Sequence, residues 1–321
     1  MTSPPAASAR LRITHTDDGD ALIRFDFGSG PASPLRIPCP ALGASGLCET
    51  WHGGEITESA ETCGAAWAHG EHYALVAISV EEVGGDVEHA AELAYERLLT
   101  CVRPSAHPFL LRIWNYFGAI NDGDGDGERY RRFCVGRARG VDGMFNDPPP
   151  AATAIGGDID PDGAACVQVI ALCARAPAIA LENPRQTPAW RYPREFGPVS
   201  PGFSRGALLD ADTDRPRLLA SGTASIVGHV SQHVGNVAAQ LRESLANLDS
   251  LLAEGEKKCG RAFPLVNCET LRVYLRHSDD LVLAQAVIRD SGIPAEQVLY
   301  LRGDVCRREL DVEIEGVFVA A

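Results

Sequence analysis

The sequence predicts an α+β protein in which one structural unit occurs twice along the chain. Three observations support this prediction: a length of 321 residues, a composition that is 45% hydrophobic, and a strand, helix, strand order in both halves. At roughly 100–200 residues per domain, this length suits two domains. Because only 22% of the residues are charged, we expect most of the chain to pack around hydrophobic cores.

The first half opens with residues 1–10, which are rich in Pro, Ala and Ser and are expected to form a disordered tail. Residues 11–27 alternate between apolar and polar as strands do. Residues 73–82 are predicted to form a buried strand, residues 86–102 an amphipathic helix, and residues 108–120 a further β-rich run. The order is therefore strand, helix, strand.

The second half repeats this order and extends it. Its predicted elements are strand, helix, strand, helix and strand over residues 218–229, 231–252, 271–276, 279–291 and 310–320. Glycine commonly ends helices, so we expect the first helix to end at Gly255 and the second at Gly292.

The halves are separated by residues 122–206, which are rich in Gly, Pro and Arg and predicted to be largely irregular. We therefore expect an N-terminal domain over residues 11–150, a substrate-binding connection over residues 151–210, and a C-terminal domain over residues 211–321. Long irregular segments in compact proteins are usually either functional or disordered.

The charge balance argues against several classes of partner. The chain has 29 Lys+Arg and 43 Asp+Glu, a formal net charge of −14. Binding to nucleic acid or to an anionic membrane depends on an excess of basic residues, so neither partner is expected. The only lysines, Lys257 and Lys258, are adjacent in a charged stretch, which argues against Schiff-base and phosphate-loop chemistry.

The cysteines and the N-terminus indicate a reduced, cytoplasmic protein. The ten cysteines include no CxxC pair, which excludes a zinc ribbon or a thioredoxin-type motif. The first residues show no basic segment followed by an apolar one, as a secretory signal would. The longest apolar stretch, residues 164–181, is too polar to span a bilayer.

No metal site is predicted, although two patterns approach one. Two acidic runs match the first half of a calcium loop, but the closing glutamate is replaced by Phe133 in one and by Val169 in the other. His229 and His233 have the spacing of one helical face, but no glutamate lies between them to act as a general base. Solvated acidic turns and locally packed histidines are the simpler interpretation.

Two arginine-rich clusters indicate a site for a small anion. Residues 182–205 combine Pro and Gly with four arginines, Arg205 among them, and with aromatic residues that include Tyr192. Residues 128–139 include Tyr130 and Arg137. Guanidinium groups and tyrosine hydroxyls on a stiffened loop suit a carboxylated ring. Two clusters suit a dianion better than a monoanion. The alternative is an ordinary surface loop with local ion pairs.

The C-terminal strand offers a candidate acid. Its apolar residues, Leu310, Val312 and Ile314, alternate with Asp311, Glu313 and Glu315. Crowded carboxylates raise one another's pKa, and a partly desolvated glutamate can then stay protonated and act as a general acid. The alternative is an exposed polar strand face.

Several motifs in the second half resemble the Rid superfamily of enamine- and imine-processing proteins. They are the Ser221-Gly222 turn, the helix NVAAQLRESLANLDSLLAEG, the segment LRVYLRHSDDL and the terminal VEIEG. With RIWNYFGAIN, ERYRRFCVGRA, ENPRQTPAWRYPREFGPVSPGFSRG and SGTASIVGH, the chain resembles the chorismatases over residues 20–320. The arginine with which simple Rid proteins bind a carboxylate, expected near Glu296 or Gln297, is absent.

The resemblance implies two Rid-like, chorismate-mutase-like α+β domains with mixed sheets and helices packed on one face. It also implies release of pyruvate from chorismate without a metal or an organic cofactor. Glu313 corresponds to the acid that protonates the methylene carbon of the enol ether. The residues implied to bind substrate or shape its wall are Tyr130, Arg137, Tyr192, Arg205, Gly222 and Ala224.

At Cys306 the chain resembles the branches of the family that form hydroxybenzoate. The expected product is therefore 3-hydroxybenzoate, and 4-hydroxybenzoate is left open as a second product. A thiol beside the ring could guide epoxide opening or proton loss, and the alternative for Cys306 is a buried core thiol. Three other functions remain open: the dihydrodiol-forming branch, a Rid-type imine deaminase, and a non-catalytic metabolite-binding regulator. A monomer and a homotrimer are both compatible with the sequence.

Overall fold

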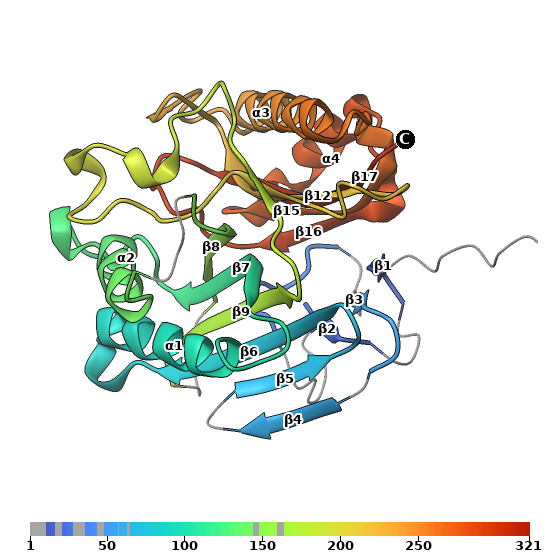
Figure 1. Ribbon diagram of the computed structural model, residues 1–321. Helices are drawn as coiled ribbons and strands as arrows, with labels where there is room; N and C mark the ends of the chain where they lie inside the picture. Colours follow the sequence, from blue (N-terminus) through green and yellow to red (C-terminus); the bar gives the residue numbers. More distant parts are fainter. Residues whose placement is uncertain are drawn as a thin grey trace, which may run out of the picture.

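The computed structural model describes residues 11–16, 21–27, 36–43, 48–56, 58–62, 65–143, 148–158 and 164–321. The tail expected over residues 1–10 lies outside this description. Two helices, α1 and α2, lie on one side of the molecule and two, α3 and α4, on the opposite side, with the main strands between them (Figure 1).

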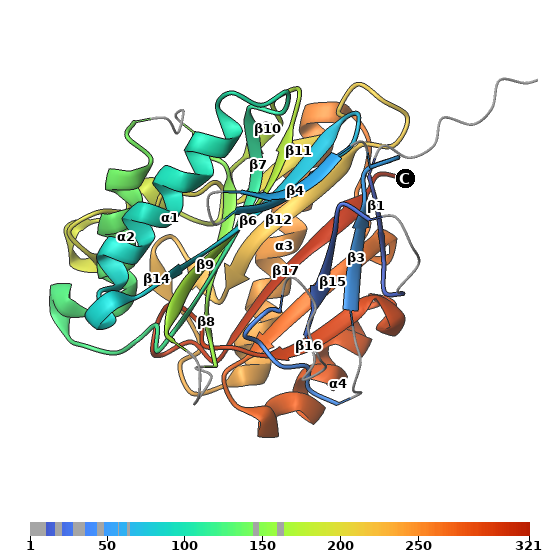
Figure 2. The same ribbon diagram turned by 90° about the horizontal axis from the view of Figure 1, so that it is seen from below.

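The first unit is a six-stranded sheet with α1 and α2 on one face. Its elements are β4 (Glu58–Thr62), β5 (Ala65–His69), β6 (Tyr73–Glu81), α1 (Val87–Val102), β7 (Phe109–Gly118), α2 (Arg129–Gly140), β8 (Ala151–Gly157) and β9 (Cys166–Ala174). The strand order is β4-β5-β6-β9-β7-β8, and only β7 and β8 pair in parallel. Figure 2 shows α1 and α2 side by side over this sheet.

The second unit has the same topology. Its elements are β10 (Ile179–Leu181), β11 (Gly206–Leu209), β12 (Arg217–Ala224), α3 (Val237–Cys259), β15 (Cys268–Leu275), α4 (Leu281–Ser291), β16 (Val298–Arg302) and β17 (Val312–Val319). The strand order is β10-β11-β12-β17-β15-β16, and only β15 and β16 pair in parallel. In both units the last strand inserts into the middle of the sheet, so the predicted duplication and the α+β class are confirmed.

Smaller elements complete the fold. A three-stranded sheet in the order β1-β3-β2 consists of β1 (Arg12–Thr14), β2 (Ile23–Asp26) and β3 (Cys48–His52), and β13 (Ile226–Val227) pairs with β14 (Val230–Ser231). Single 3-10 turns occupy Val83–Gly85, Gly125–Gly127, Ala189–Arg191, Arg194–Phe196, Leu265–Asn267, Ser278–Asp280 and Ala295–Gln297.

Three of the four apolar cores among the described residues arise because both faces of each large sheet are covered. On β6, Val76 and Ile78 pack under α1, whereas Tyr73 and Leu75 face the second unit. The core between the sheets also receives Phe25 from the small sheet. Because strand side chains alternate between the two faces of a sheet, nearly every side chain of a strand is buried when both faces are covered. The helix-free faces of the two units therefore meet in the centre.

The expectation of irregular structure over residues 122–206 is wrong for much of that segment. It contains α2, β8, β9 and β10, and the basic run of residues 128–139 forms α2 itself. Strands β8 and β9 complete the first sheet, and β10 and β11 begin the second. Because residues 151–210 thus contribute to both sheets, we propose that the units divide at residues 175–178.

The predicted boundaries of α3 are also corrected by the structure. The helix begins after Asn236, whose side chain accepts a hydrogen bond from the amide of Ala239, whereas His233 has a φ of 57° and cannot continue a helix. Gly255 lies inside the helix, where a Cβ would approach Leu218 Cδ1 to 2.5 Å. The helix ends before Gly260, which adopts the left-handed conformation.

Candidate active site

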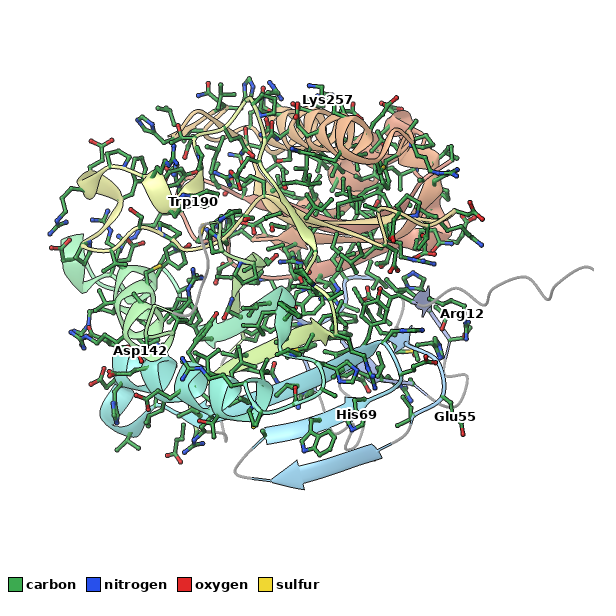
Figure 3. All side chains as sticks on the ribbon, viewed as in Figure 1. Arg12, Glu55, His69, Asp142, Trp190 and Lys257 are labelled. Carbon is green, nitrogen blue, oxygen red and sulfur yellow. The ribbon has the colours of Figure 1, made fainter. Side chains whose placement is uncertain are left out.

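A cavity of about 300 Å³ lies between the two units, and all eight site residues expected from the sequence line it. They come from α2, from residues 188–205, from β12, and from β17 with the loop before it. They are Tyr130, Arg137, Tyr192, Arg205, Gly222, Ala224, Cys306 and Glu313. Figure 3 shows the segment that carries Trp190 lying over α2.

Glu313 projects from β17 into this cavity. On the helix side of β17, Val312 and Ile314 are buried in the core beneath α3 and α4, so Glu313 and Glu315 face the space between the sheets. Both carboxylates are buried, with 5% and 3% of their surface exposed, so the alternative of an exposed polar strand face is wrong.

The surroundings of Glu313 favour its protonated form. Burial and, to a lesser extent, the charge of Glu315 raise the pKa of its carboxyl to about 8, against the opposing effect of Arg112 and Arg205. Within the part of the chain that the structure describes, no hydrogen bond to either oxygen opposes this effect. Glu313 is therefore a neutral acid near pH 7 and can donate a proton.

The backbone approaches this acid closely at Gly222. The register between β12 and β17 shifts between Ala220 and Thr223, so Gly222 lies in a bulge beside Glu313. A Cβ at this position would lie 1.9 Å from Oε1 of Glu313. Ala224, by contrast, pairs directly with Glu313 across the strands. Gly222 therefore provides space for the carboxyl, and Ala224 sets the distance of the neighbouring wall.

Arg205 is a buried cation with unused hydrogen-bonding capacity. Its Nη2 donates to the hydroxyl of Tyr192 at 2.8 Å and to the carbonyl of Thr187 at 2.9 Å. Its Nε is buried without a partner, and its guanidinium lies 5.1 Å from the ring centroid of Phe203. Arg137 is also buried and lies over the ring of Tyr95 at 5.9 Å. Buried guanidinium groups that line a cavity can bind an anionic ligand.

Arg307 belongs to the site but was not predicted from the sequence. Its guanidinium lies 4.3 Å from the ring centroid of Phe196 and 5.3 Å from that of Tyr192, and its Nη1 donates to the carbonyl of His229 at 2.9 Å. Its Nη2 is buried without a partner. Arg307 follows Cys306 without forming a motif in the sequence, so only its position against the rings of Phe196 and Tyr192 identifies it.

Cys306 and Tyr130 form a weakly polar wall next to Glu313. Burial raises the pKa of the Cys306 thiol, and the nearby Glu313 raises it further. Burial also raises the pKa of the Tyr130 hydroxyl. Both groups therefore remain protonated, and Cys306 is available as a neutral hydrogen-bond donor and not as a thiolate. Its side chain lines the cavity and also packs against two apolar cores.

Other arginines of the two clusters make local ion pairs, as the surface-loop alternative expects. Arg194 pairs with Asp126, Arg185 with Glu243, and Arg132 with carboxylates on and before α1. The surface-loop alternative thus holds for part of each cluster. Within the described residues, neither Arg205 nor Arg307 has a carboxylate at ion-pairing distance.

The histidine pair does not form the helical face that its spacing suggested. Both residues precede α3, and His233 contacts Glu243 at 3.2 Å. In the described part of the chain, no group of three or more His, Cys, Asp or Glu side chains could hold a metal ion. No helix among the described residues is long and apolar enough to cross a membrane.

The fold corresponds to that of known proteins. The family model of the N-terminal domain of FkbO/Hyg5-like chorismatases matches residues 49–173. A chorismatase from Streptomyces rapamycinicus is 36% identical over 278 residues, which are 84% of this chain and 82% of the relative. The chain belongs to the chorismatase family, as its motifs predicted.

Two further relatives are informative. A 3-hydroxybenzoate synthase from Streptomyces hygroscopicus is 32% identical over 292 residues, which are 88% of this chain and 84% of that protein. The crystal structure of a chorismatase at 1.08 Å resolution matches with a TM-score of 0.83 and 30% identity, over 96% of this chain and 97% of the other.

Proposed function

We propose that this enzyme converts chorismate into 3-hydroxybenzoate and pyruvate. The observation that carries the proposal is a buried, protonated Glu313 in a cavity that Arg205 and Arg307 line, neither of which has a carboxylate at ion-pairing distance among the described residues. Chorismate carries two carboxylates, which suit these arginines, and a vinyl ether whose methylene carbon must be protonated. The name of the relative from S. hygroscopicus, 3-hydroxybenzoate synthase, supports the same product.

Substrate binding is assigned to the cations and hydroxyls of the cavity wall. Arg205 and Arg307 would hold one carboxylate, because both have unused N–H groups next to Tyr192. Arg137 and Tyr130, on α2, would hold the other. Both units contribute residues to this wall.

The chemistry begins with protonation at carbon. Glu313 gives its proton to the methylene carbon of the enol ether, and the ether oxygen supplies the electron pair that forms the oxocarbenium ion. The 4-hydroxyl of the ring then attacks the carbon that bears the ether. The C–O bond breaks toward the oxocarbenium and releases pyruvate, and the hydroxyl proton returns to Glu313. The resulting arene oxide opens and loses a ring proton to give the aromatic product.

Cys306 would act on the arene oxide as a neutral hydrogen-bond donor. A thiol donating to the epoxide oxygen would favour opening toward 3-hydroxybenzoate, and opening in the other sense would give 4-hydroxybenzoate as a second product. Water attack on the oxocarbenium ion would instead give the dihydrodiol. Four aromatic side chains, those of Tyr130, Tyr192, Phe196 and Phe203, line the cavity, and the water they exclude from the oxocarbenium ion would favour the intramolecular route.

The test is to incubate the purified protein with chorismate and measure pyruvate with coupled lactate dehydrogenase. Chromatography against 3-hydroxybenzoate, 4-hydroxybenzoate and the dihydrodiol then identifies the ring product. We expect equimolar pyruvate and 3-hydroxybenzoate, and loss of both in Glu313→Gln. Glu296→Gln, which alters an exposed glutamate that does not line the cavity, is the matched control and should retain activity.

Four results would contradict the proposal. Full activity in Glu313→Gln would refute the mechanism, and pyruvate with the dihydrodiol alone would refute the assigned product. Tight chorismate binding without turnover would indicate a metabolite-binding regulator. Indifference to chorismate together with ammonia release from an imino acid would indicate a deaminase.

A further inference from the structure

A sealed network of charged side chains lies directly behind Glu313. Its centre is Glu315, on the same face of β17, which accepts hydrogen bonds from four side chains. Oε1 accepts from Tyr274 at 2.8 Å and from Arg272 at 3.1 Å, and Oε2 accepts from Arg112 and Thr153. A carboxylate with these donors is fixed in position and in charge.

The network continues to the small N-terminal sheet. Arg272 also binds Glu49 of β3 through Nε and Nη2, and its guanidinium lies 4.4 Å from the ring centroid of Phe25. Glu49 accepts further bonds from Thr270 and from the indole of Trp51. Two buried carboxylates thus balance Arg112 and Arg272, so the network is neutral and well hydrogen-bonded.

Thr153 is the link between this network and the catalytic wall. Its hydroxyl donates to Glu315 and accepts from Arg112 and from the amide of Gly222, the last at 2.8 Å. One donor and two acceptors are the full capacity of a hydroxyl group. The Thr153 methyl lies 2.9 Å from the position of a Cβ on Gly222, so Thr153 touches the bulge through both branches.

We propose that Thr153 and Glu315 are positioning residues for proton transfer by Glu313. Thr153 holds the amide of Gly222 and thereby the bulge that gives the Glu313 carboxyl its space. Glu315 holds Thr153 and places a fixed negative charge on the closed side of the acid. The inference rests on the proposed function of Glu313. It adds that Thr153 sets the position of the Glu313 carboxyl and that Glu315 favours its protonated state.

The charged and titratable groups around Glu313 define what each substitution changes. Glu315 from the same strand opposes ionisation, and Arg112 from β7 and Arg205 before β11 favour it. Two neutral groups complete the surroundings, the Tyr130 hydroxyl from α2 and the Cys306 thiol. Substitution of Thr153 alters none of these charges, whereas Glu315→Gln alters one.

The first experiment compares Thr153→Val with Thr153→Ser. Valine keeps the shape and removes the hydroxyl, and serine keeps the hydroxyl and removes the methyl. We expect Thr153→Val to lower kcat for pyruvate release about tenfold with KM within about twofold, and Thr153→Ser to stay within about twofold of wild type. Loss of thermal stability in Thr153→Val with unchanged kcat would show a merely structural role and overturn the proposal.

The second experiment follows the titration of Glu313 itself. Removing the negative charge of Glu315 makes ionisation of Glu313 easier, so in Glu315→Gln we expect the alkaline limb of kcat to move down by about one pH unit. The limb should stay in place in Thr153→Val. An unmoved limb in folded Glu315→Gln would overturn the assigned role of Glu315.

Infrared absorption of the protonated carboxyl, compared with Glu313→Gln, reports the same shift without turnover. A wild-type protein that does not convert chorismate would therefore refute the proposed function, and the infrared titration would still decide the effect of Glu315. Should Glu315→Gln fail to fold, the Thr153 pair decides the proposal, since it leaves every charge in place.

Discussion

Replacing Gly222 with alanine should disable the acid and leave the fold intact. The added Cβ would lie 1.9 Å from Oε1 of Glu313 and 2.9 Å from the Thr153 methyl. An ordinary van der Waals contact begins near 3.4 Å, so the carboxyl oxygen must move by about 1.5 Å. A displacement of about 1 Å at a reacting group can cost about 100-fold in rate. We therefore expect kcat to fall about 100-fold.

The effect on stability should be much smaller, because the nearest atom belongs to the Glu313 side chain, which lines the cavity and can rotate into it. We expect Gly222→Ala to change the free energy of unfolding by at most about 1–2 kcal/mol, as overpacking is partly offset by the lost chain entropy of glycine. A domain stable by about 5–15 kcal/mol then remains folded, and the loss of rate is not a loss of protein.

The assay is the coupled pyruvate measurement, with thermal unfolding of the same samples. Gly127→Ala is the control, because Gly127 is exposed and a Cβ there meets no atom within 4 Å. Wild-type kcat in Gly222→Ala would show that the acid does not act from the observed position. A large fall in stability accompanied by normal kcat per folded molecule would refute the reasoning as well.

Three further predictions concern the cavity. The pKa of Glu313 is raised from 4.5 to about 8, so between these pH values the folded state keeps a proton that the unfolded state has released. Thermal stability should therefore fall as pH rises from about 4.5 to 8. In Glu313→Gln this dependence on pH should be flatter. The same titration should make kcat decline above about pH 8, as a pH series would show. Cys306→Ala should keep pyruvate release near the wild-type rate and shift the ring products from 3-hydroxybenzoate toward 4-hydroxybenzoate; an unchanged product ratio on chromatography would contradict a role for the thiol. Arg307→Ala should raise KM for chorismate by at least about tenfold with little change in kcat. Arg307→Lys should recover only part of the lost affinity, because lysine lacks the planar guanidinium that stacks on Phe196. An unchanged KM in Arg307→Ala would exclude Arg307 from carboxylate binding.

The local elements were largely predictable because their signals are local. The apolar run of β6, the helical spacing and N-terminal Asp86 of α1, and Gly292 after α4 are confirmed by the structure. The boundaries of α3 were wrong because a helix can bury an internal glycine against a neighbour, as Gly255 packs on Leu218. The sequence records the glycine but not what faces it.

The site was predictable where residues form motifs and not where they meet by folding. Glu313, Cys306 and the binding residues on α2 and residues 188–205 were identified from motifs, and the structure brings them to one cavity. Arg307 and Thr153 were missed, because each is an ordinary residue whose role depends on neighbours distant in the chain.

The sequence alone determined the α+β class, the internal duplication, the family and the alternation that places Glu313 and Glu315 on one face of β17. Only the tertiary structure decided that this face is buried, since a period of two residues sets the direction of side chains and not what covers them. The neutral state of Glu313 follows from that covering, because desolvation by the opposite unit is what raises its pKa. The fixed charge behind it depends on contacts such as Arg112 with Glu315, which lie far apart in the chain and exist only once the two sheets have met.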